Sequence, residues 1–281
     1  MIVIVIGLGH IGGSIAISLK ENGFAKTIIG CDTNLIHEQK ALDNGLIDKV
    51  LDLSSAIKIA DIIIVATPVN TLVRLLPKIL HQLRDGQVVI DVGSTKREVV
   101  AATAGHPRRG QFIATHPMSG TEFSGPESAV LYQFDGKVTV FCDTIKSDAN
   151  TINVATRMYR SLRMRIVEID ATSHDTHVAY ISHISHIASF ALAITVLEKE
   201  KDEHRIFELA SSGFSSTVRL AKSAPETWIP IFEQNQENVL DVLDQYIHVL
   251  QDMRANLANQ RFDKLRQQIA QANDIKRVLT G

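Results

Sequence analysis

The chain opens with a short apolar run that leads directly into a glycine-rich turn. Residues 2–6 read I-V-I-V-I, and Gly7, Gly9 and Gly12 follow. A run that is apolar at every position predicts a strand buried on both faces, as in a parallel sheet. In a G-x-G-x-x-G turn, the first glycine allows the tight turn, the second lets the backbone approach a pyrophosphate, and the third lets the next helix pack closely. The sequence therefore predicts a βαβ unit that binds a dinucleotide.

An acidic residue stands where such a unit contacts the adenosine ribose of its cofactor. A second apolar run, Thr27–Cys31, ends in Asp32, 20 residues after Gly12. A carboxylate at this place accepts hydrogen bonds from the ribose hydroxyls and repels a 2′-phosphate. The alternative, a glycine-rich turn that binds nothing, gives no reason for Asp32, so we predict NAD as the cofactor in preference to NADP. The residues expected to contact NAD are Gly7, Leu8, Gly9, Ile11, Gly12 and Asp32, with Thr67 and Pro68 from the loop after the third strand.

Short apolar runs alternate with helical patterns through the first 170 residues, which is typical of a parallel sheet built from βαβ units. Strands are expected over residues 2–6, 27–31, 62–66, 88–91, 112–115, 138–142 and 166–169. Helices are expected between them over residues 11–22, 35–44, 71–82, 96–104 and 148–163. Later strand patterns cease, and helices are expected over residues 172–199, 203–210, 225–249 and 254–272. We predict an α/β fold with an N-terminal Rossmann domain over residues 1–170 and an all-α domain over residues 171–281.

Composition and charge exclude several classes of partner. The 281 residues carry a net charge of −2, which provides no basic surface for nucleic acid or for an anionic membrane. Cys31 and Cys142 share no motif spacing, so we expect reduced, buried thiols. Residues 2–6 lack the charged flank and the cleavage site of a signal peptide. We expect a cytoplasmic protein whose partner is a small-molecule substrate.

One segment of the helical half is long enough to span a bilayer. Residues 178–197 contain no charged side chain, and a membrane span needs about 20 apolar residues. The segment also contains His183, His186 and several hydroxyl side chains, and the sequence offers no second span. These features favour a helix buried at an interface between two copies of the chain, so we predict a homodimer.

Polar side chains follow two neighbouring strands of the predicted sheet. Ser94 comes after the strand over residues 88–91, and His116 comes after the strand over residues 112–115. Because ligands lie beyond the carboxyl ends of the strands in open α/β sheets, both side chains are expected beside the nicotinamide. Each has a simpler alternative: Ser94 as the cap of a helix, and His116 as a loop histidine held rigid by Pro117.

The helical half adds two pairs of histidines. His183 and His186 lie three residues apart on one helix face, a spacing also found in metal sites. No acidic ligand accompanies them on that helix, so we predict no metal. His174 and His177 repeat the spacing beside Asp175, and their polar surroundings predict a solvated helix start.

A single arginine follows a polar loop that contains glycine. Arg219 closes the segment S-S-G-F-S-S-T-V-R, and its planar guanidinium is suited to binding a carboxylate through two parallel hydrogen bonds. The alternative for Arg219 is a surface salt bridge.

Taken in order, these motifs resemble the prephenate dehydrogenase family and its arogenate-using relatives. The resemblance rests on G-L-G-H-I-G, Asp32, D-V-G-S-T-K, H-P-M-S-G-T-E, I-S-H-I-S-H and S-S-G-F-S-S-T-V-R-L-A-K-S-A-P. It extends from Ile2 to about Val249. The chain departs from the family in one motif, with S-H-I-S-H where many members have S-H-L-P-H. The resemblance implies a Rossmann domain followed by an all-helical dimerisation domain.

The resemblance also implies a reaction, the NAD-dependent oxidative decarboxylation of prephenate to 4-hydroxyphenylpyruvate in tyrosine biosynthesis. His116 would accept the proton of the ring hydroxyl, since a neutral imidazole with a pKa near the working pH suits that task. Ser94 would orient the same hydroxyl. The substrate is a dianion, so its carboxylates would be held by Arg219, His186 and His183. Thr121 and Glu122 would lie at the mouth of the pocket, where Glu122 would join an ionic network.

Three alternatives stay open. An arogenate dehydrogenase would give tyrosine directly through the same chemistry. A 3-hydroxyacid dehydrogenase would share the fold but depend on a lysine of the helical domain, for which Lys222 is the candidate. A catalytically inactive NAD-sensing module would keep the fold and lose the reaction, although Ser94, His116 and Arg219 are all present.

Overall fold

The computed structural model describes residues 1–203 and 205–278, except for the side chain of Asp202. The chain divides into two compact units, residues 1–235 and 236–281, which are described separately. The first unit contains the sheet, the glycine-rich turn and every candidate site residue.

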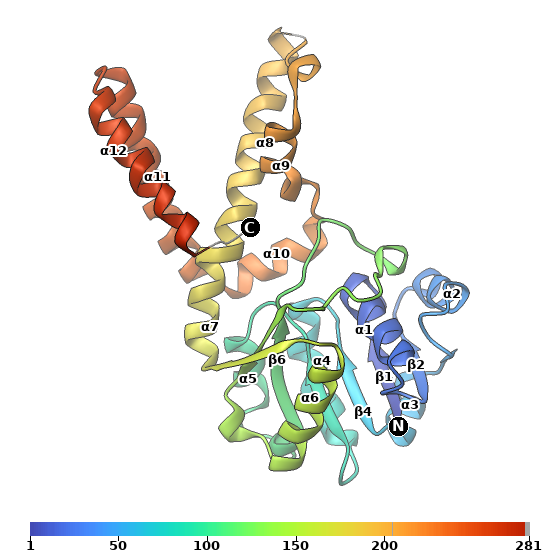
Figure 1. Cartoon of the computed structure of the whole chain (residues 1–281). Helices are drawn as coiled ribbons and strands as arrows, with labels where there is room; N and C mark the ends of the chain where they lie inside the picture. The colour runs from blue at the N-terminus through green and yellow to red at the C-terminus, as the bar shows by residue number, and fades with distance from the viewer. Residues whose placement is uncertain (204, 279–281) are drawn as a thin grey trace. The chain divides into compact units, whose positions relative to one another are not determined.

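The first unit is built on one eight-stranded sheet (Figure 1). Its strands are β1 (Ile2–Ile6), β2 (Thr27–Cys31), β3 (Lys49–Val50), β4 (Ile62–Val65), β5 (Val88–Asp91), β6 (Phe112–Pro117), β7 (Val138–Cys142) and β8 (Arg165–Ile169). Their order in the sheet is β3-β2-β1-β4-β5-β6-β7-β8, and all neighbours are parallel except β6 and β7. In a doubly wound sheet of this order the ligand crevice lies where the strand order reverses, here between β1 and β4.

Helices cover both faces of the sheet (Figure 1). One layer contains α1 (His10–Glu21) and α6 (Ala149–Ser161), and the other contains α3 (Leu53–Ile59), α4 (Val69–Gln82) and α5 (Arg97–Thr103). Alternate residues of β1 serve the two layers, because Val3 and Val5 belong to one buried cluster while Ile4 and Ile6 belong to the other. A strand covered on both faces must be apolar at every position, which explains the uniform run at the start of the chain.

The predicted fold class is confirmed, and four strands have the bounds expected from the sequence: β1, β2, β5 and β7. The sequence analysis missed β3 and α3. The strand β3 is only two residues long, too short to show a periodic pattern. The helix α3 begins where the Asp52 side chain accepts a hydrogen bond from the Ser55 N–H at 3.0 Å, a cap that the sequence analysis had not used. The helix α2 (Leu35–Asp43), whose Ala41 belongs to the same buried cluster as α1 and α6, was predicted to within one residue.

The strand β6 is longer than predicted. His116 and Pro117 belong to the strand and pair with Val140 and Thr139 of β7. The interpretation of His116 as a loop histidine is therefore wrong. The antiparallel partner β7 extends β6 beyond the end of its parallel neighbour β5, and a proline is tolerated there because it stands at the end of the strand.

The helical segment after β8 is interrupted by one π-helical turn. It begins as α7 (Ala171–Val178), passes through a π-helical turn (Ala179–His183), and continues as α8 (Ile184–Glu203). The sequence predicted one regular helix over most of this segment. A π turn inside an α-helix is often found at a functional site, and this one carries His183.

Shorter helices complete the first unit: α9 (Ser212–Thr217), a 3-10 turn (Arg219–Lys222) and α10 (Pro225–Gln234). The helix expected over residues 203–210 includes His204, which lies outside the described residues, and within residues 205–210 only the 3-10 turn Phe207–Leu209 is helical. The helix expected over residues 225–249 is interrupted at Asn235, whose side chain instead donates a hydrogen bond to the Asp175 carbonyl at 2.7 Å.

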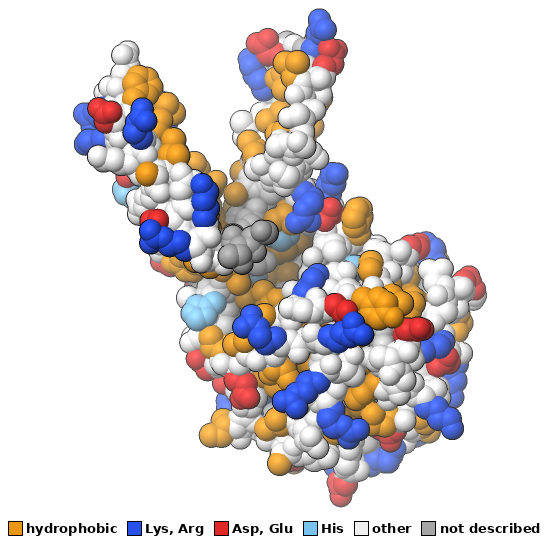
Figure 2. Space-filling model, viewed as in Figure 1, with side chains coloured by type: hydrophobic (Ala, Val, Ile, Leu, Met, Phe, Trp, Pro, Cys, Tyr) orange, Lys and Arg blue, Asp and Glu red, His pale blue; other side chains and the backbone are white. Residues whose placement is uncertain are grey.

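The helical segment after β8 is long and apolar. Among the described residues, Ala171–Lys201 has the length and composition of a membrane span, with a mean hydropathy of 1.5, but one such helix is weak evidence for a membrane. Only 17% of its most apolar window is buried, and Ile181, Ile194 and Leu197 are more than half exposed. Hydrophobic side chains are visible along α8 in Figure 2, so this helix presents apolar side chains that the described residues of the first unit leave exposed.

The second unit is a helical pair. It contains α11 (Gln236–Ala258) and α12 (Phe262–Ala272), which lie side by side (Figure 1) and are linked by a hydrogen bond from the Asn256 amide to Gln268 Oε1 at 3.1 Å. The sequence predicted a helix over residues 254–272. The structure places residues 254–258 in α11 instead and begins α12 at Phe262.

Candidate active site

The glycine-rich turn has the geometry that its spacing predicts. Gly7 has φ +91°, and a Cβ on it would lie 2.6 Å from the Ala66 carbonyl oxygen. A Cβ on Gly12 would lie 2.0 Å from the Gly7 carbonyl oxygen, so α1 can pack this closely only without a side chain. A Cβ on Gly9 would meet nothing within 4 Å. The first and third glycines are therefore required by the turn itself, while the second borders open space at the N-terminus of α1, which fits a bound pyrophosphate.

Asp32 stands at the carboxyl end of β2, as predicted, and it also holds the glycine-rich turn. Its Oδ2 accepts a hydrogen bond from the Leu8 N–H at 2.7 Å, and its Oδ1 accepts one from the Asn34 N–H at 2.9 Å. The Leu8 side chain is completely buried, and Ile11 packs against the same cluster. Leu8 and Ile11 thus contribute their side chains to the core rather than to the crevice.

The loop after β4 contains an unused polar atom. The Oγ1 of Thr67 is buried and has no hydrogen-bond partner among the described residues. Pro68 is exposed and forms the N-cap of α4. Since buried hydroxyls are normally hydrogen-bonded, Thr67 Oγ1 in the crevice is suited to a ligand. Together with the open space at Gly9, it indicates that these residues fit a dinucleotide.

A buried ion pair joins the ends of β5 and β6, and the sequence analysis missed it. Asp91 and Lys96 are both completely buried and paired with each other, and Lys96 Nζ also donates to the Thr115 carbonyl at 2.7 Å. Asp91 Oδ1 accepts the Thr115 N–H at 3.0 Å. Burial raises the pKa of Asp91 above its ordinary value, although Lys96 opposes the shift. These bonds fix the loop that carries Ser94 against the strand that carries His116.

Ser94 lies in this loop, half-buried, and it does not cap the following helix. The N-cap of α5 is Lys96, without a hydrogen bond from its own side chain. The first N–H groups of α5 are instead bound by Asp175, whose two carboxylate oxygens accept from Lys96 N–H at 2.7 Å and Arg97 N–H at 2.8 Å. The interpretation of Ser94 as a helix cap is therefore wrong.

His116 lies in a chain of hydrogen bonds that continues into α7. Its Nδ1 is 2.9 Å from Nε2 of His174, and Nδ1 of His174 is 2.7 Å from Oδ1 of Asp175. His174 and Asp175 are only 2% and 1% exposed, so the predicted solvated helix start is wrong for them, whereas His177, three residues beyond His174 in α7, is exposed. Burial lowers the pKa of His116 well below its ordinary value, and the neighbouring His174, Lys96 and His183 lower it further.

His183 and His186 both pack against Trp228 of α10. His183 is 1% exposed, lies edge-on to the Trp228 ring at 5.8 Å, and has its Nδ1 3.2 Å from the Asn235 amide. His186 stacks on the same indole with 3.5 Å between ring centroids. Burial lowers the pKa of His183 to about 4 and lowers that of His186. Both rings are therefore neutral near pH 7 in the ligand-free protein.

Arg219 and Glu122, predicted separately, form an ion pair. The Arg219 side chain is 50% exposed and that of Glu122 is 11% exposed. Glu122 has a lowered pKa, first because its carboxylate accepts its own backbone N–H and then because of Arg219. Thr121, beside Glu122, accepts the Phe123 N–H at 3.3 Å. The two residues from distant parts of the chain thus meet, and Arg219 is close enough to lower the pKa of His186.

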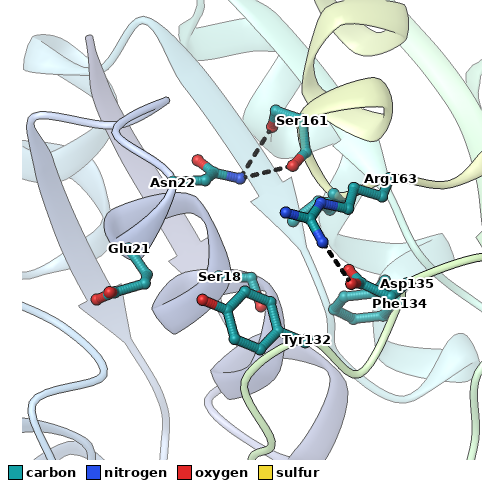
Figure 3. Close-up of a pocket in the computed structure, with 9 residues that line it drawn as sticks. Ser18, Glu21, Asn22, Tyr132, Phe134, Asp135, Ser161 and Arg163 are labelled. Carbon is teal, nitrogen blue, oxygen red and sulfur yellow. Dashed lines mark hydrogen bonds and ion pairs between the residues drawn. The ribbon is translucent and has the colours of Figure 1, made fainter.

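A cavity of about 160 Å³ lies elsewhere in the first unit. It is lined by residues at the C-terminal ends of α1 and α6 and by Tyr132, Phe134 and Asp135, and it contains none of the predicted site residues (Figure 3). Arg163 is paired with Asp135 at 3.0 Å and the Asn22 amide donates to the Ser161 carbonyl at 2.9 Å, so its polar groups largely satisfy one another. The candidate active site is therefore the edge of the sheet where β1, β4, β5 and β6 end.

Two family models match the chain in succession. Residues 15–168 match the nucleotide-binding domain of prephenate dehydrogenase, and residues 170–271 match its dimerization domain. The chain is 31% identical to the prephenate dehydrogenase of Bacillus subtilis over 277 residues, which cover 98% of this chain and 75% of that protein. It is 28% identical to the prephenate dehydrogenase of Lactococcus lactis over 87% of this chain and 68% of that protein.

Solved structures give the same result. Prephenate dehydrogenase from Aquifex aeolicus, in complex with hydroxyphenyl propionate and NAD⁺, superposes with a TM-score of 0.86 at 27% identity, covering 99% of this chain and 97% of that chain. The arogenate dehydrogenase of Synechocystis superposes with a TM-score of 0.76 at 28% identity, covering 99% of this chain and all of that chain. The two family models together cover most of the chain, the solved structures share its fold, and the glycine-rich turn has the predicted geometry. This chain therefore belongs to the prephenate dehydrogenase family.

Proposed function

We propose that this enzyme catalyses the oxidative decarboxylation of prephenate to 4-hydroxyphenylpyruvate with NAD. The observation that carries the proposal is the placement of His116 at the end of β6, bonded through Nδ1 to a buried histidine, within the electrostatic reach of His183. NAD, when bound, supplies the acceptor for the hydride that leaves the substrate. Gly7, Gly9 and Gly12 would hold its pyrophosphate, Asp32 its adenosine ribose, and Thr67 the nicotinamide side.

In this mechanism His116 is the general base. Its Nδ1 is occupied by His174, so Nε2 is the atom available to take the proton of the ring hydroxyl. The Ser94 hydroxyl makes no hydrogen bond to another described residue, and it would orient the same hydroxyl. The ketone that forms on the ring draws electrons from the bond to the ring carboxylate, and aromatisation makes the loss of CO₂ irreversible. A positioned base of this kind accounts for roughly 10²–10⁴-fold of the rate.

The substrate carboxylates would be held by side chains of the helical segments that follow β8. Arg219 would bind a substrate carboxylate either in place of Glu122 or together with it, since a guanidinium can bind a carboxylate through two parallel bonds. His186 donates Nδ1–H to the Ser182 carbonyl at 3.0 Å, so its Nε2 can bind a carboxylate only after it takes up a proton. The dianionic substrate would favour that protonation. In His183 the Nδ1 accepts from the Asn235 amide at 3.2 Å, so the Nε2 of its neutral ring carries the proton and would donate to a carboxylate directly.

The preference between prephenate and arogenate is open to a direct measurement. Absorbance of NADH is followed after the protein is mixed with NAD and either substrate. We expect faster turnover with prephenate; faster turnover with arogenate would transfer the proposal to the arogenate-using relatives. NADH formation from neither substrate would contradict the proposed function.

Asp32→Ser should reduce the preference for NAD. A 2′-phosphate beside Asp32 would bring two negative charges within a few ångströms, a repulsion of about 1–4 kcal/mol at an effective dielectric constant of 80–20. We expect the unmodified enzyme to prefer NAD at least about tenfold in kcat/KM and the variant to lose most of this preference. The matched control is Asp61→Ser, because Asp61 binds the Ile2 N–H at the opposite end of β1. Equal use of NADP by the unmodified enzyme would contradict the prediction.

The protein should be a homodimer in solution. The apolar side chains exposed on α8 belong to the region that matches the dimerization domain, and a symmetric interface would remove them from water. Light scattering at micromolar concentration should give twice the mass of the chain, 31.0 kDa. A charged substitution such as Ile194→Glu should shift the protein toward monomer, whereas Ile145→Glu, at a 93% exposed residue outside this helix, should not.

We further propose a domain boundary near Asp170 and a cytoplasmic location. The two family models meet between residues 168 and 170. Cys31 and Cys142 are both buried free thiols, and burial raises the pKa of each to about 12. Such thiols are unreactive and are typical of proteins from a reducing compartment.

A further inference from the structure

We propose that His174 and Asp175 are positioning residues that hold His116 in the tautomer whose Nε2 lone pair accepts the substrate proton. The proposal rests on the role of His116 proposed above and deepens it. The observation behind it is the continuous set of hydrogen bonds from the His116 ring, through the His174 ring, to the Asp175 carboxylate. His174 and Asp175 lie in α7, more than fifty residues beyond His116 in the sequence.

The direction of each bond follows from the Asp175 end. The Asp175 carboxylate accepts the backbone N–H groups of Lys96 and Arg97. A carboxylate in this position acts only as an acceptor, so its third partner, Nδ1 of His174, must carry a proton and donate it. This assignment uses no property of His116.

The same reasoning then sets the two rings. A neutral imidazole has one N–H and one lone pair, so once Nδ1 of His174 carries its proton, its Nε2 is an acceptor. The neighbouring Nδ1 of His116 must therefore donate to it. That leaves the Nε2 of His116 with a lone pair, which is the state a general base requires. The opposite tautomer of His116 would present an N–H to the substrate hydroxyl and could not remove its proton.

The surroundings keep His174 neutral. Burial lowers the pKa of His174, and Lys96 lowers it further, while Asp175 and Asp91 oppose the shift. The groups that face the two rings are Lys96 and Asp91 from the β5–α5 segment, Asp175 from α7 and His183 from the π turn. If His174 were protonated, its Nε2 would donate to His116 and force the inactive tautomer.

A purely structural role makes different predictions. If Asp175 only capped α5, its replacement would lower the stability of the protein and leave the tautomer of His116 unchanged. If His174 only filled space, an apolar side chain of similar size would replace it without loss of kcat. A structural role and a positioning role can therefore be distinguished by measuring the tautomer of His116 in the protein without substrate and kcat during turnover.

The test uses four variants of the full chain. Asp175→Asn offers an amide N–H₂ that can donate to Nδ1 of His174 and so reverse every bond of the set. His174→Leu removes the relay but leaves the Asp175 cap on α5 intact. His174→Gln keeps an acceptor for His116 and a donor for Asp175. His177→Asn is the matched control, because His177 is exposed on the same helix.

The first readout is nuclear magnetic resonance of protein labelled with ¹⁵N in its histidines. The signal of His116 is assigned by its disappearance in His116→Asn. We expect the Nδ1–H tautomer of His116 in the unmodified protein and the Nε2–H tautomer in Asp175→Asn. An Nε2–H tautomer in the unmodified protein, or no change in Asp175→Asn, would overturn the proposal.

The second readout is kinetic, with prephenate and NAD. We expect Asp175→Asn to lower kcat by about 10²–10⁴, the range seen when an aspartate that orients a catalytic histidine is replaced by asparagine, with little change in KM. His174→Leu should also lower kcat, whereas His174→Gln should retain most of it and His177→Asn all of it. Unchanged kcat in His174→Leu would overturn the proposal. If the tautomers were as expected but no variant and not even the unmodified protein reacted with prephenate, the proposed function would be contradicted. The hydrogen-bond relay through His174 and Asp175 would still be supported.

Discussion

Replacement of His116 by asparagine is expected to lower kcat by about 10²–10⁴ while KM for the substrate changes little. Asparagine keeps a polar side chain at the end of β6 but has no lone pair basic enough to take the proton of the ring hydroxyl. The measurement is steady-state NADH formation with prephenate and NAD. The matched control is His81→Asn, which changes an exposed histidine at the end of α4 and should leave kcat unchanged.

The pH profile of kcat/KM should report the ionisation of His116. Burial lowers the pKa of His116 well below its ordinary value, so the proposed base is neutral at pH 7, and its own protonation should lower activity only below about pH 6.5. The sequence predicted a pKa near neutrality for this group, and the structure lowers the expected pKa. This limb should disappear from the residual activity of His116→Asn. A variant that kept both the rate and the acid limb would show that His116 is not the base.

Replacement of Arg219 by alanine is expected to act on KM instead. A charge-assisted hydrogen bond to a carboxylate contributes roughly 1.5–3 kcal/mol, and the Arg219 side chain is half exposed, which weakens its charge interactions. We expect KM for prephenate to rise about ten- to a hundredfold, with KM for NAD unchanged. The measurement is the same assay with each substrate varied in turn.

Two further variants separate substrate binding from the ion pair with Glu122. Lys222→Ala removes another cation of the same 3-10 turn and should leave both KM values unchanged. Glu122→Gln frees Arg219 from its charged partner, so KM for prephenate should not rise. If Glu122→Gln raised KM as much as Arg219→Ala, the ion pair itself would matter and Arg219 would not bind the substrate directly.

The sequence was most informative where the determinants are local. The glycine-rich turn, the strand before it and Asp32 all lie within the first βαβ unit, and each was predicted because backbone geometry demands particular residues at fixed spacing. The bounds of β1 and β2 follow directly from that pattern. In contrast β3 and α3 carry no pattern of their own, since one is a two-residue pairing and the other depends on a capping side chain.

Determinants that are distant in sequence were missed or misread. His174 and Asp175 look like the polar start of a surface helix, and only the packing of α7 against α5 shows that both are buried. Lys96 looks like a surface lysine after a turn, yet it is completely buried on Asp91. One signal was available: Asp91 and Lys96 flank the loop that carries Ser94, and a charge at the end of a buried strand requires a partner.

The position of Asp175 has a consequence for exchanging parts between relatives. The proposed base His116 precedes residue 170, and the two residues proposed to orient it, His174 and Asp175, follow in the region that matches the second family model. A chimaera joined at residue 170 takes the base from one parent and its orientation from the other. Such hybrids are expected to be active only when both parents have the same histidine–aspartate pair against α5. A junction beyond Asn235 would instead take His116, His174 and Asp175 from the same parent.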